Sequence, residues 1–201
     1  MSKTKAHAKR IVLTGGPGAG KTAVLEMVRH MLCPNITILP ESASILFGGG
    51  FWRKPSLPAK KAAQRAIYYV QRELEQMALD DPQSGTLLCD RGTLDGLAYW
   101  PGTKSAFFKQ VNTTQESELA RYDVIIHLHS PMADSGYDLS NPVRTENAEE
   151  AAVIDALIEA AWRGHPHRHF IASSKNFMEK ARKALTIIEN ELPYGCEKPL
   201  T

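Results

Sequence analysis

The chain has 201 residues, of which 43% are hydrophobic and 23% charged, the balance of a folded globular protein rather than a disordered one. Its formal charge of +2 gives no reason to expect nucleic acid or a membrane surface as the main partner. The sequence has no apolar run of membrane-spanning length and no signal-peptide pattern, and its three cysteines form no C-x-x-C pair. We therefore expect a single domain over residues 1–201 in the reducing cytoplasm.

Short apolar runs alternate with longer helical patterns, which indicates βαβ units and a parallel sheet in an α/β domain. The runs are almost continuously apolar, as in strands covered on both faces. In chain order the predicted elements are strand 10–14, helix 21–32, strand 37–40, helix 58–80, strand 86–89, strand 123–129, helix 148–163, strand 169–172 and helix 175–192. Residues 47–58 and 130–142 are predicted to be loops.

The strongest motif follows the first predicted strand and leads directly into a helix. It matches the phosphate-binding loop, or P-loop, pattern G-x-x-x-x-G-K-[ST] in full. Its glycines let the backbone approach phosphate oxygens, its lysine contacts the β and γ phosphates, and its threonine offers a hydroxyl to Mg²⁺. A chance match is the alternative, but the flanking strand and helix argue against it. The predicted nucleotide-binding residues are Gly15, Gly16, Pro17, Gly18, Ala19, Gly20, Lys21, Thr22 and Ala23.

Two carboxylates follow apolar strands. Because the carboxyl ends of parallel strands line the ligand-binding edge of such a sheet, both should face the P-loop. Asp90 is the candidate to hold Mg²⁺ together with Thr22, and Glu41 is the candidate base for an acceptor hydroxyl. The alternative for Asp90 is a turn or cap residue, and Glu41 has a similar structural alternative.

Arg91 lies beside Asp90, where an arginine pairs naturally with phosphate. Asp95 follows in the same turn, and it either holds a substrate hydroxyl or caps a helix. Arg144 belongs to segment 130–147, a candidate lid that would bring an arginine to the transferring phosphate, although a solvated arginine at a helix start is the alternative. Arg53 lies in segment 47–58. This segment is a candidate substrate loop, and the alternative is a mobile surface loop.

Histidines form two groups in the sequence. His165, His167 and His169 alternate, so that an extended segment would place them on one face. No carboxylate or cysteine accompanies them at ligand spacing, which favours a polar strand entrance over a metal site. His127 and His129 flank a strand end, and either a role at the ligand edge or an ordinary strand-end position fits them.

These motifs together resemble the AAA-type P-loop family that groups the nicotinamide riboside kinase domain with the photoreceptor channel translocation-defect proteins. The resemblance spans most of the chain and implies a three-layer P-loop kinase-like core, with a five-stranded parallel sheet of order 2-3-1-4-5 and a helical lid. It also implies that Glu41, Asp90 and Arg91 act as in deoxynucleoside kinases and that Gln64 faces the acceptor. The runs that carry it are residues 11–22, 39–43, 64–67, 89–96, 141–146, Trp162 and 165–168.

Two functions fit this set of residues. The first is phosphoryl transfer from ATP with Mg²⁺ to a small hydroxyl-bearing acceptor, nucleoside-like or phosphorylated. The second is a nucleotide-dependent switch or binding protein that recognises a phosphorylated head group. The sequence has no Asn-Lys-x-Asp run, the guanine-reading motif of switch GTPases, which favours ATP over GTP.

Overall fold

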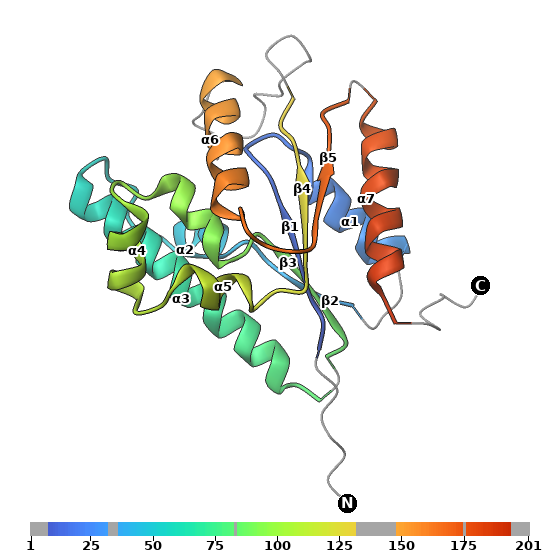
Figure 1. Cartoon of the computed structure of the whole chain (residues 1–201), viewed down its shortest axis with the longest axis horizontal. Coiled ribbons are helices and arrows are strands. Elements are labelled where there is room, and N and C mark those ends of the chain that lie inside the picture. Colours follow the sequence, from blue (N-terminus) through green and yellow to red (C-terminus); the bar gives the residue numbers. More distant parts are fainter. Residues whose placement is uncertain (1–7, 32–35, 83, 132–147, 175, 194–201) are drawn as a thin grey trace, which may run out of the picture.

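The computed structural model describes residues 8–31, 36–82, 84–131, 148–174 and 176–193. Five strands form one sheet in the order β2-β3-β1-β4-β5, and every neighbouring pair is parallel (Figure 1). This confirms the predicted α/β class and strand order. The strands are β1 (Arg10–Thr14), β2 (Ile36–Leu39), β3 (Thr86–Asp90), β4 (Val124–Leu128) and β5 (Arg168–Ile171).

Helices cover both faces of this sheet (Figure 1). The helices α1 and α7 pack on one face, and α3, α6 and the 3₁₀ helix η1 pack on the other. The predicted helices are present at nearly the predicted bounds, whereas α2, η1, α4 and α5 were not predicted. The bounds are α1 (Lys21–Met31), α2 (Ser42–Gly48), α3 (Leu57–Asp80), η1 (Thr93–Tyr99), α4 (Lys104–Val111), α5 (Gln115–Leu119), α6 (Ala148–Ala161) and α7 (Phe177–Glu191).

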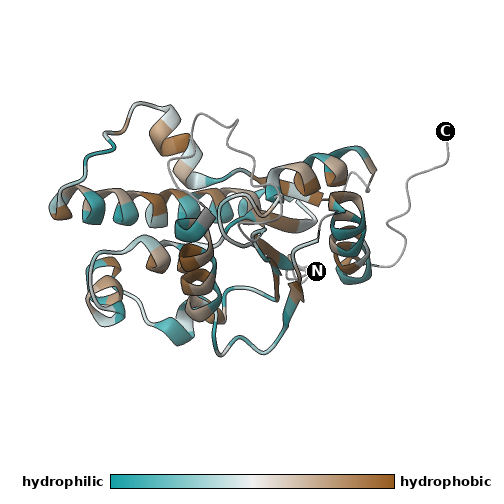
Figure 2. Ribbon diagram, turned by 90° about the horizontal axis from the view of Figure 1, so that it is seen from above, coloured by the Kyte–Doolittle hydropathy of each residue, from teal (hydrophilic) through white to brown (hydrophobic). Residues whose placement is uncertain are grey.

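The central strands β1, β3 and β4 are mostly apolar because each face of the sheet has its own core. On β1, Ile11 and Leu13 pack with α1 and α7, while Val12 packs with α6 and η1. All three side chains have no exposed surface. Figure 2 shows the hydrophobic residues concentrated in the central strands, with hydrophilic residues on the outer sides of the helices. Every helix among the described segments is too short or too polar to traverse a bilayer.

A buried ionic network joins the long helix α3 to the sheet. Glu75 on α3 has no exposed surface and accepts hydrogen bonds from Gln71 Nε2 (2.9 Å), Tyr122 Oη (2.6 Å) and Arg121. Arg10, at the start of β1, lies 3.8 Å from the same carboxylate. Buried charges require such partners, so this network fixes how α3 packs against the sheet near the start of β1 and β4.

The structure describes all of residues 47–58 and the first two residues of the candidate lid 130–147. Residues 47–58 begin inside α2 and end inside α3, and the connection between these helices is exposed. Only Ser130 and Pro131 of the candidate lid lie in the described part of the chain, so Arg144 lies outside the described residues.

Candidate active site

The P-loop connects the carboxyl end of β1 to α1, and at Gly15 and Gly20 a positive φ coincides with a lack of room for a Cβ atom. Gly15 has φ +134°, and a Cβ atom there would lie 2.0 Å from the carbonyl oxygen of Leu128. Gly20 has φ +91°, and its Cβ would lie 2.6 Å from the ring of Phe177 on α7. These two glycines allow the tight turn that brings the N-terminus of α1, with its unpaired N–H groups and positive dipole end, to the loop.

Lys21, the first residue of α1, is buried within the loop. Its ammonium group donates hydrogen bonds to the carbonyl oxygens of Gly15 (2.9 Å) and Gly16 (3.0 Å). Burial, and next the positive charge of Arg91, lower the pKa of Lys21 from 10.5 to about 8, although nearby carboxylates including Asp90 oppose the shift. An ammonium group in this position gains most from a ligand with several negative charges.

Arg91 links the P-loop to the ends of β2 and β3. Its Nε donates to Glu41 Oε1 (2.7 Å), and its Nη1 donates to the carbonyl oxygen of Gly15 (3.1 Å) and to Asp95 Oδ1 (3.1 Å). Its backbone has φ +71°, a left-handed conformation that is costly for a residue with a Cβ. Such strain, held in place by several contacts at a strand end, is typical of functional sites.

Asp90 is the last residue of β3 and lies level with Leu13 of β1. Its Oδ1 atom is buried without a hydrogen-bond partner among the described residues. Burial raises the pKa of Asp90 from 3.8 to about 6, against the opposing charge of Lys21. A buried carboxylate oxygen with no donor is the kind of group that a hard cation satisfies, so Asp90 fits a magnesium ligand.

Glu41 follows β2 and precedes α2, and its side chain reaches Arg91. It also accepts a hydrogen bond from Ser44. Burial favours a higher pKa, but the charge of Arg91 and the hydrogen bonds from Ser44 and Arg91 outweigh it and hold the pKa of Glu41 below its usual value. Glu41 is therefore ionised at neutral pH and accepts hydrogen bonds.

Asp95 is 3% exposed, and donors surround its carboxylate. Oδ1 accepts from Thr14 and Arg91, and Oδ2 accepts from the N–H of Gly92 (3.1 Å) and the indole of Trp162 (3.0 Å). Of its two predicted roles, the structure displays the capping one, because Asp95 completes the first turn of η1. Its contacts brace Arg91 and β1.

The other predicted residues lie at different places. Thr22 is exposed at the start of α1, next to Lys21. Gln64 is buried on α3, with its Oε1 beside Gly96. Arg53 is exposed, and its guanidinium lies 4.3 Å from the ring centroid of Phe47.

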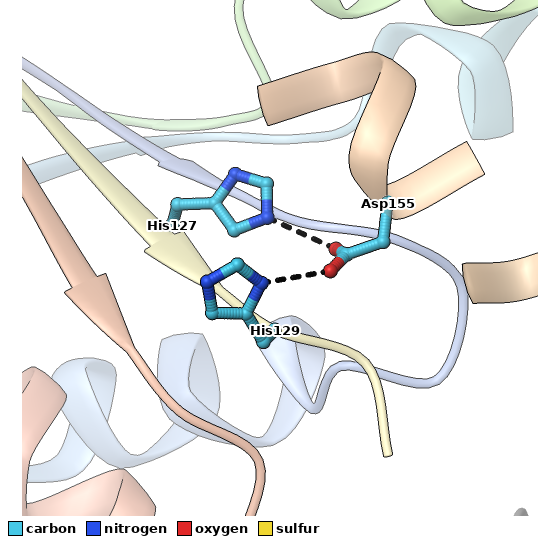
Figure 3. Close-up of side chains that lie close together, drawn as sticks. All are labelled: His127, His129 and Asp155. Atoms are coloured by element: carbon cyan, nitrogen blue, oxygen red, sulfur yellow. Dashed lines mark hydrogen bonds and ion pairs between the residues drawn. The ribbon is translucent and has the colours of Figure 1, made fainter. Parts of the chain in front are cut away.

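Asp155 on α6 is a site residue that the sequence analysis missed (Figure 3). Its Oδ1 accepts from the backbone N–H of Gly16 (2.6 Å) and from His127 Nε2 (3.0 Å), and its Oδ2 accepts from His129 Nδ1 (2.9 Å). Partial burial would raise the pKa of Asp155, but hydrogen bonds from His127, His129 and Gly16 hold it well below its usual range. This carboxylate attaches the P-loop to α6. A mid-helix aspartate carries no local sequence signal of such a role.

Lys180 on α7 supports the loop from the other face of the sheet and was also missed. Its ammonium group donates to the carbonyl oxygens of Ala19 (2.8 Å) and His129 (2.6 Å). Burial lowers the pKa of Lys180 from 10.5 to about 8, against the charge of Asp155. Together with Phe177, which lies against Gly20, it fixes the second half of the P-loop to α7.

The fold and the loop define a P-loop nucleotide-binding domain of kinase-like topology. The chain belongs to the AAA domain family, whose model matches residues 10–180. A thymidylate kinase from Candida albicans, whose structure was described as revealing the origin of broad substrate specificity and a novel structural element, is similar, with a TM-score of 0.56 over 92% of each chain and 13% sequence identity. No curated protein sequence matches. These findings confirm the resemblance to a P-loop kinase-like family.

Proposed function

We propose that the protein is an ATP- and Mg²⁺-dependent phosphotransferase, with a small hydroxyl-bearing acceptor that is nucleoside-like or phosphorylated. The observation that carries this proposal is the grouping of Lys21, Asp90, Glu41 and Arg91 at one edge of the sheet. A nucleotide-binding loop needs only the lysine and an acid for the metal. A second carboxylate paired with an arginine adds groups that suit an acceptor.

The proposed chemistry rests on positioning and charge. Lys21 leaves the carbonyl oxygens of Gly15 and Gly16 for the γ-phosphate, because a charged acceptor gives a stronger hydrogen bond. Thr22 and Asp90 would hold Mg²⁺, which when bound neutralises charge on the phosphate oxygens. Arg91 would bind phosphate oxygens through its guanidinium group.

Glu41 orients the acceptor hydroxyl and takes its proton as the new P–O bond forms. Because its pKa lies below the usual value, Glu41 is a weak base, and its main contribution is the direction in which it holds the hydroxyl. This suits phosphoryl transfer, in which the proton leaves late and orientation supplies much of the rate.

The test is acceptor-dependent release of ADP from Mg·ATP, with a panel of nucleosides, vitamins and inositol phosphates. Glu41→Gln and Asp90→Asn should each reduce acceptor-stimulated turnover about 100-fold or more. The exposed residues Glu73 and Asp80 on α3 provide matched controls. Glu73→Gln and Asp80→Asn make the same changes of charge, but away from the P-loop. Tight nucleotide binding without acceptor stimulation would instead favour a switch that binds a phosphorylated head group.

A further inference from the structure

Two histidines and a glutamate come together at the end of the sheet that lies opposite the P-loop. His167 directly precedes β5 and His169 lies on it, while Glu191 is the last residue of α7. The P-loop follows the carboxyl end of β1, and β5 runs parallel to it, so the start of β5 is at the other end (Figure 1). This cluster therefore takes no part in the proposed phosphotransferase site.

The three ligand atoms form a nearly regular triangle. The two Nε2 atoms lie 3.1 Å apart, and Glu191 Oε1 lies 3.3 Å from Nε2 of His167 and 3.6 Å from Nε2 of His169. Tetrahedral zinc has bonds of about 2.0–2.1 Å to imidazole nitrogen and carboxylate oxygen, which separates neighbouring ligand atoms by about 3.3–3.4 Å. The triangle therefore has the dimensions of one face of a zinc coordination tetrahedron.

The surroundings support the same interpretation. Lys9 Nζ lies 2.5 Å from Glu191 Oε2, which leaves Oε1 directed at the two imidazoles, as an outer partner of a metal-binding carboxylate does. The side chain of His167 is 47% exposed, so an ion has access, and solvent can supply a fourth ligand. The spacing of the histidines alone does not reveal this site, because its carboxylate belongs to Glu191, at the end of a helix and 22 residues after His169.

The second histidine cluster is a weaker candidate for a metal site. There Asp155 already accepts hydrogen bonds from the backbone N–H groups of Gly16 (2.6 Å) and Ser130 (3.4 Å) in addition to both imidazoles. A cation would have to displace imidazole donors from a carboxylate that holds the P-loop in place. His127 is also 2% exposed, which leaves little access.

We infer that His167, His169 and Glu191 bind a single Zn²⁺ ion, which joins the end of α7 to the start of β5. Imidazole nitrogen with one carboxylate oxygen is a donor set that zinc accepts well. Bound zinc stabilises the docking of α7 on the sheet, because it binds the folded arrangement of two elements that separate on unfolding.

The experiment uses the full chain, freed of metal with a chelator and titrated with zinc in competition with a chromogenic chelator. One zinc ion per chain is expected, and Co²⁺ in its place should give the visible absorption bands of a tetrahedral site. His167→Ala, His169→Ala and Glu191→Gln should each weaken zinc binding by about 100-fold or more, beyond the range seen for outer partners. His30→Ala, which removes an exposed histidine on α1, is the matched control and should bind as the parent does.

A second measurement keeps the test decisive if a ligand variant folds poorly. Zinc at about 100 times its Kd should raise the Tm of the parent by about 5–10 °C and leave the Tm of Glu191→Gln unchanged. Lys9→Met, which keeps all three ligands, should weaken binding by about 10- to 100-fold. Absence of zinc binding to the parent, equal binding by the ligand variants, or loss of binding in His129→Ala but not in His167→Ala would each overturn the inference.

Discussion

At Lys21 the fold surrounds an ammonium group with carbonyl oxygens and carboxylates instead of water. Its pKa of about 8 in the protein without nucleotide must rise when a polyphosphate binds, so binding takes up a proton at alkaline pH. Between pH 7 and 8, above the pKa of about 6 at Asp90, nucleotide affinity should therefore change little, and above pH 8 it should fall by up to about tenfold per pH unit. Isothermal titration calorimetry between pH 7 and 9.5 measures this.

Two variants distinguish the contribution of Lys21 to this pH dependence from that of other groups that titrate near the loop. Lys21→Arg keeps its charge over this range, so its weaker affinity should show no such fall. Lys180 has a similar pKa of about 8, and Lys180→Met should retain the pH dependence of the parent. A Lys21→Arg protein whose affinity still falls above pH 8 would contradict the assignment.

Arg91 offers a test of backbone strain that is independent of activity. Arg91→Ala and Arg91→Gly both remove the guanidinium and its contacts to Glu41 and Asp95. Only glycine adopts φ +71° without cost, so the glycine variant should be the more stable of the two by about 1 kcal/mol in urea unfolding. Equal stability would show that this position does not need the left-handed conformation in solution.

At the scale of elements, two helices hold the P-loop from opposite faces of the sheet. Asp155 on α6 binds its first half through Gly16, and Lys180 on α7 binds its second half through Ala19. The loop is thus positioned by tertiary contacts as well as by its own glycines.

Removal of the α6 attachment should have a measurable cost. Asp155→Ala leaves His127 and the Gly16 N–H buried without their acceptor, and we expect a loss of about 3 kcal/mol in unfolding free energy together with weaker nucleotide binding. Glu149→Ala, an exposed change on the same helix, is the control. Urea unfolding and nucleotide titration on both variants provide the comparison, and parent-like values for Asp155→Ala would contradict the attachment.

Over the whole molecule, the buried network around Glu75 joins α3 to β1 and to the turn before β4. Glu75→Met should cost about 3–5 kcal/mol, because Arg121 and Tyr122 are left buried without their carboxylate. The double variant Glu75→Met/Arg121→Met should recover part of that loss, since it also removes the charge of Arg121 and leaves only that of Arg10. Urea midpoints of the three proteins measure this, and a double variant less stable than Glu75→Met would refute the explanation.

The sheet and the longer helices could be predicted because their signals are local. Continuous apolar runs identify buried parallel strands, and the three-and-four spacing along 58–80 identifies α3. The helices η1, α4 and α5 are too short for such periodicity, although Thr103 and Thr114 do cap the last two in the structure. Chain order and strand-end position were enough to place Glu41, Asp90 and Arg91 at the nucleotide-binding edge.

The missed residues depend on tertiary contacts that no local pattern encodes. Asp155 and Lys180 lie inside helices, where charged residues are ordinary, and they become site residues only when α6 and α7 dock beside β4. For Asp95 the sequence allowed either a substrate-binding or a capping role, and its four donors come from contacts that only the folded structure shows.

The strand order also separates two groups of residues around the P-loop. The half formed by β2 and β3 supplies Glu41, Asp90 and Arg91, whereas β4, β5 and their helices supply the supports of the P-loop. Under the proposed function, segment 41–111 is therefore the unit to exchange between relatives of this chain when acceptor preference is compared. Such a graft would exchange Glu41, Asp90 and Arg91 together and leave the P-loop with its supports on α6 and α7 in place.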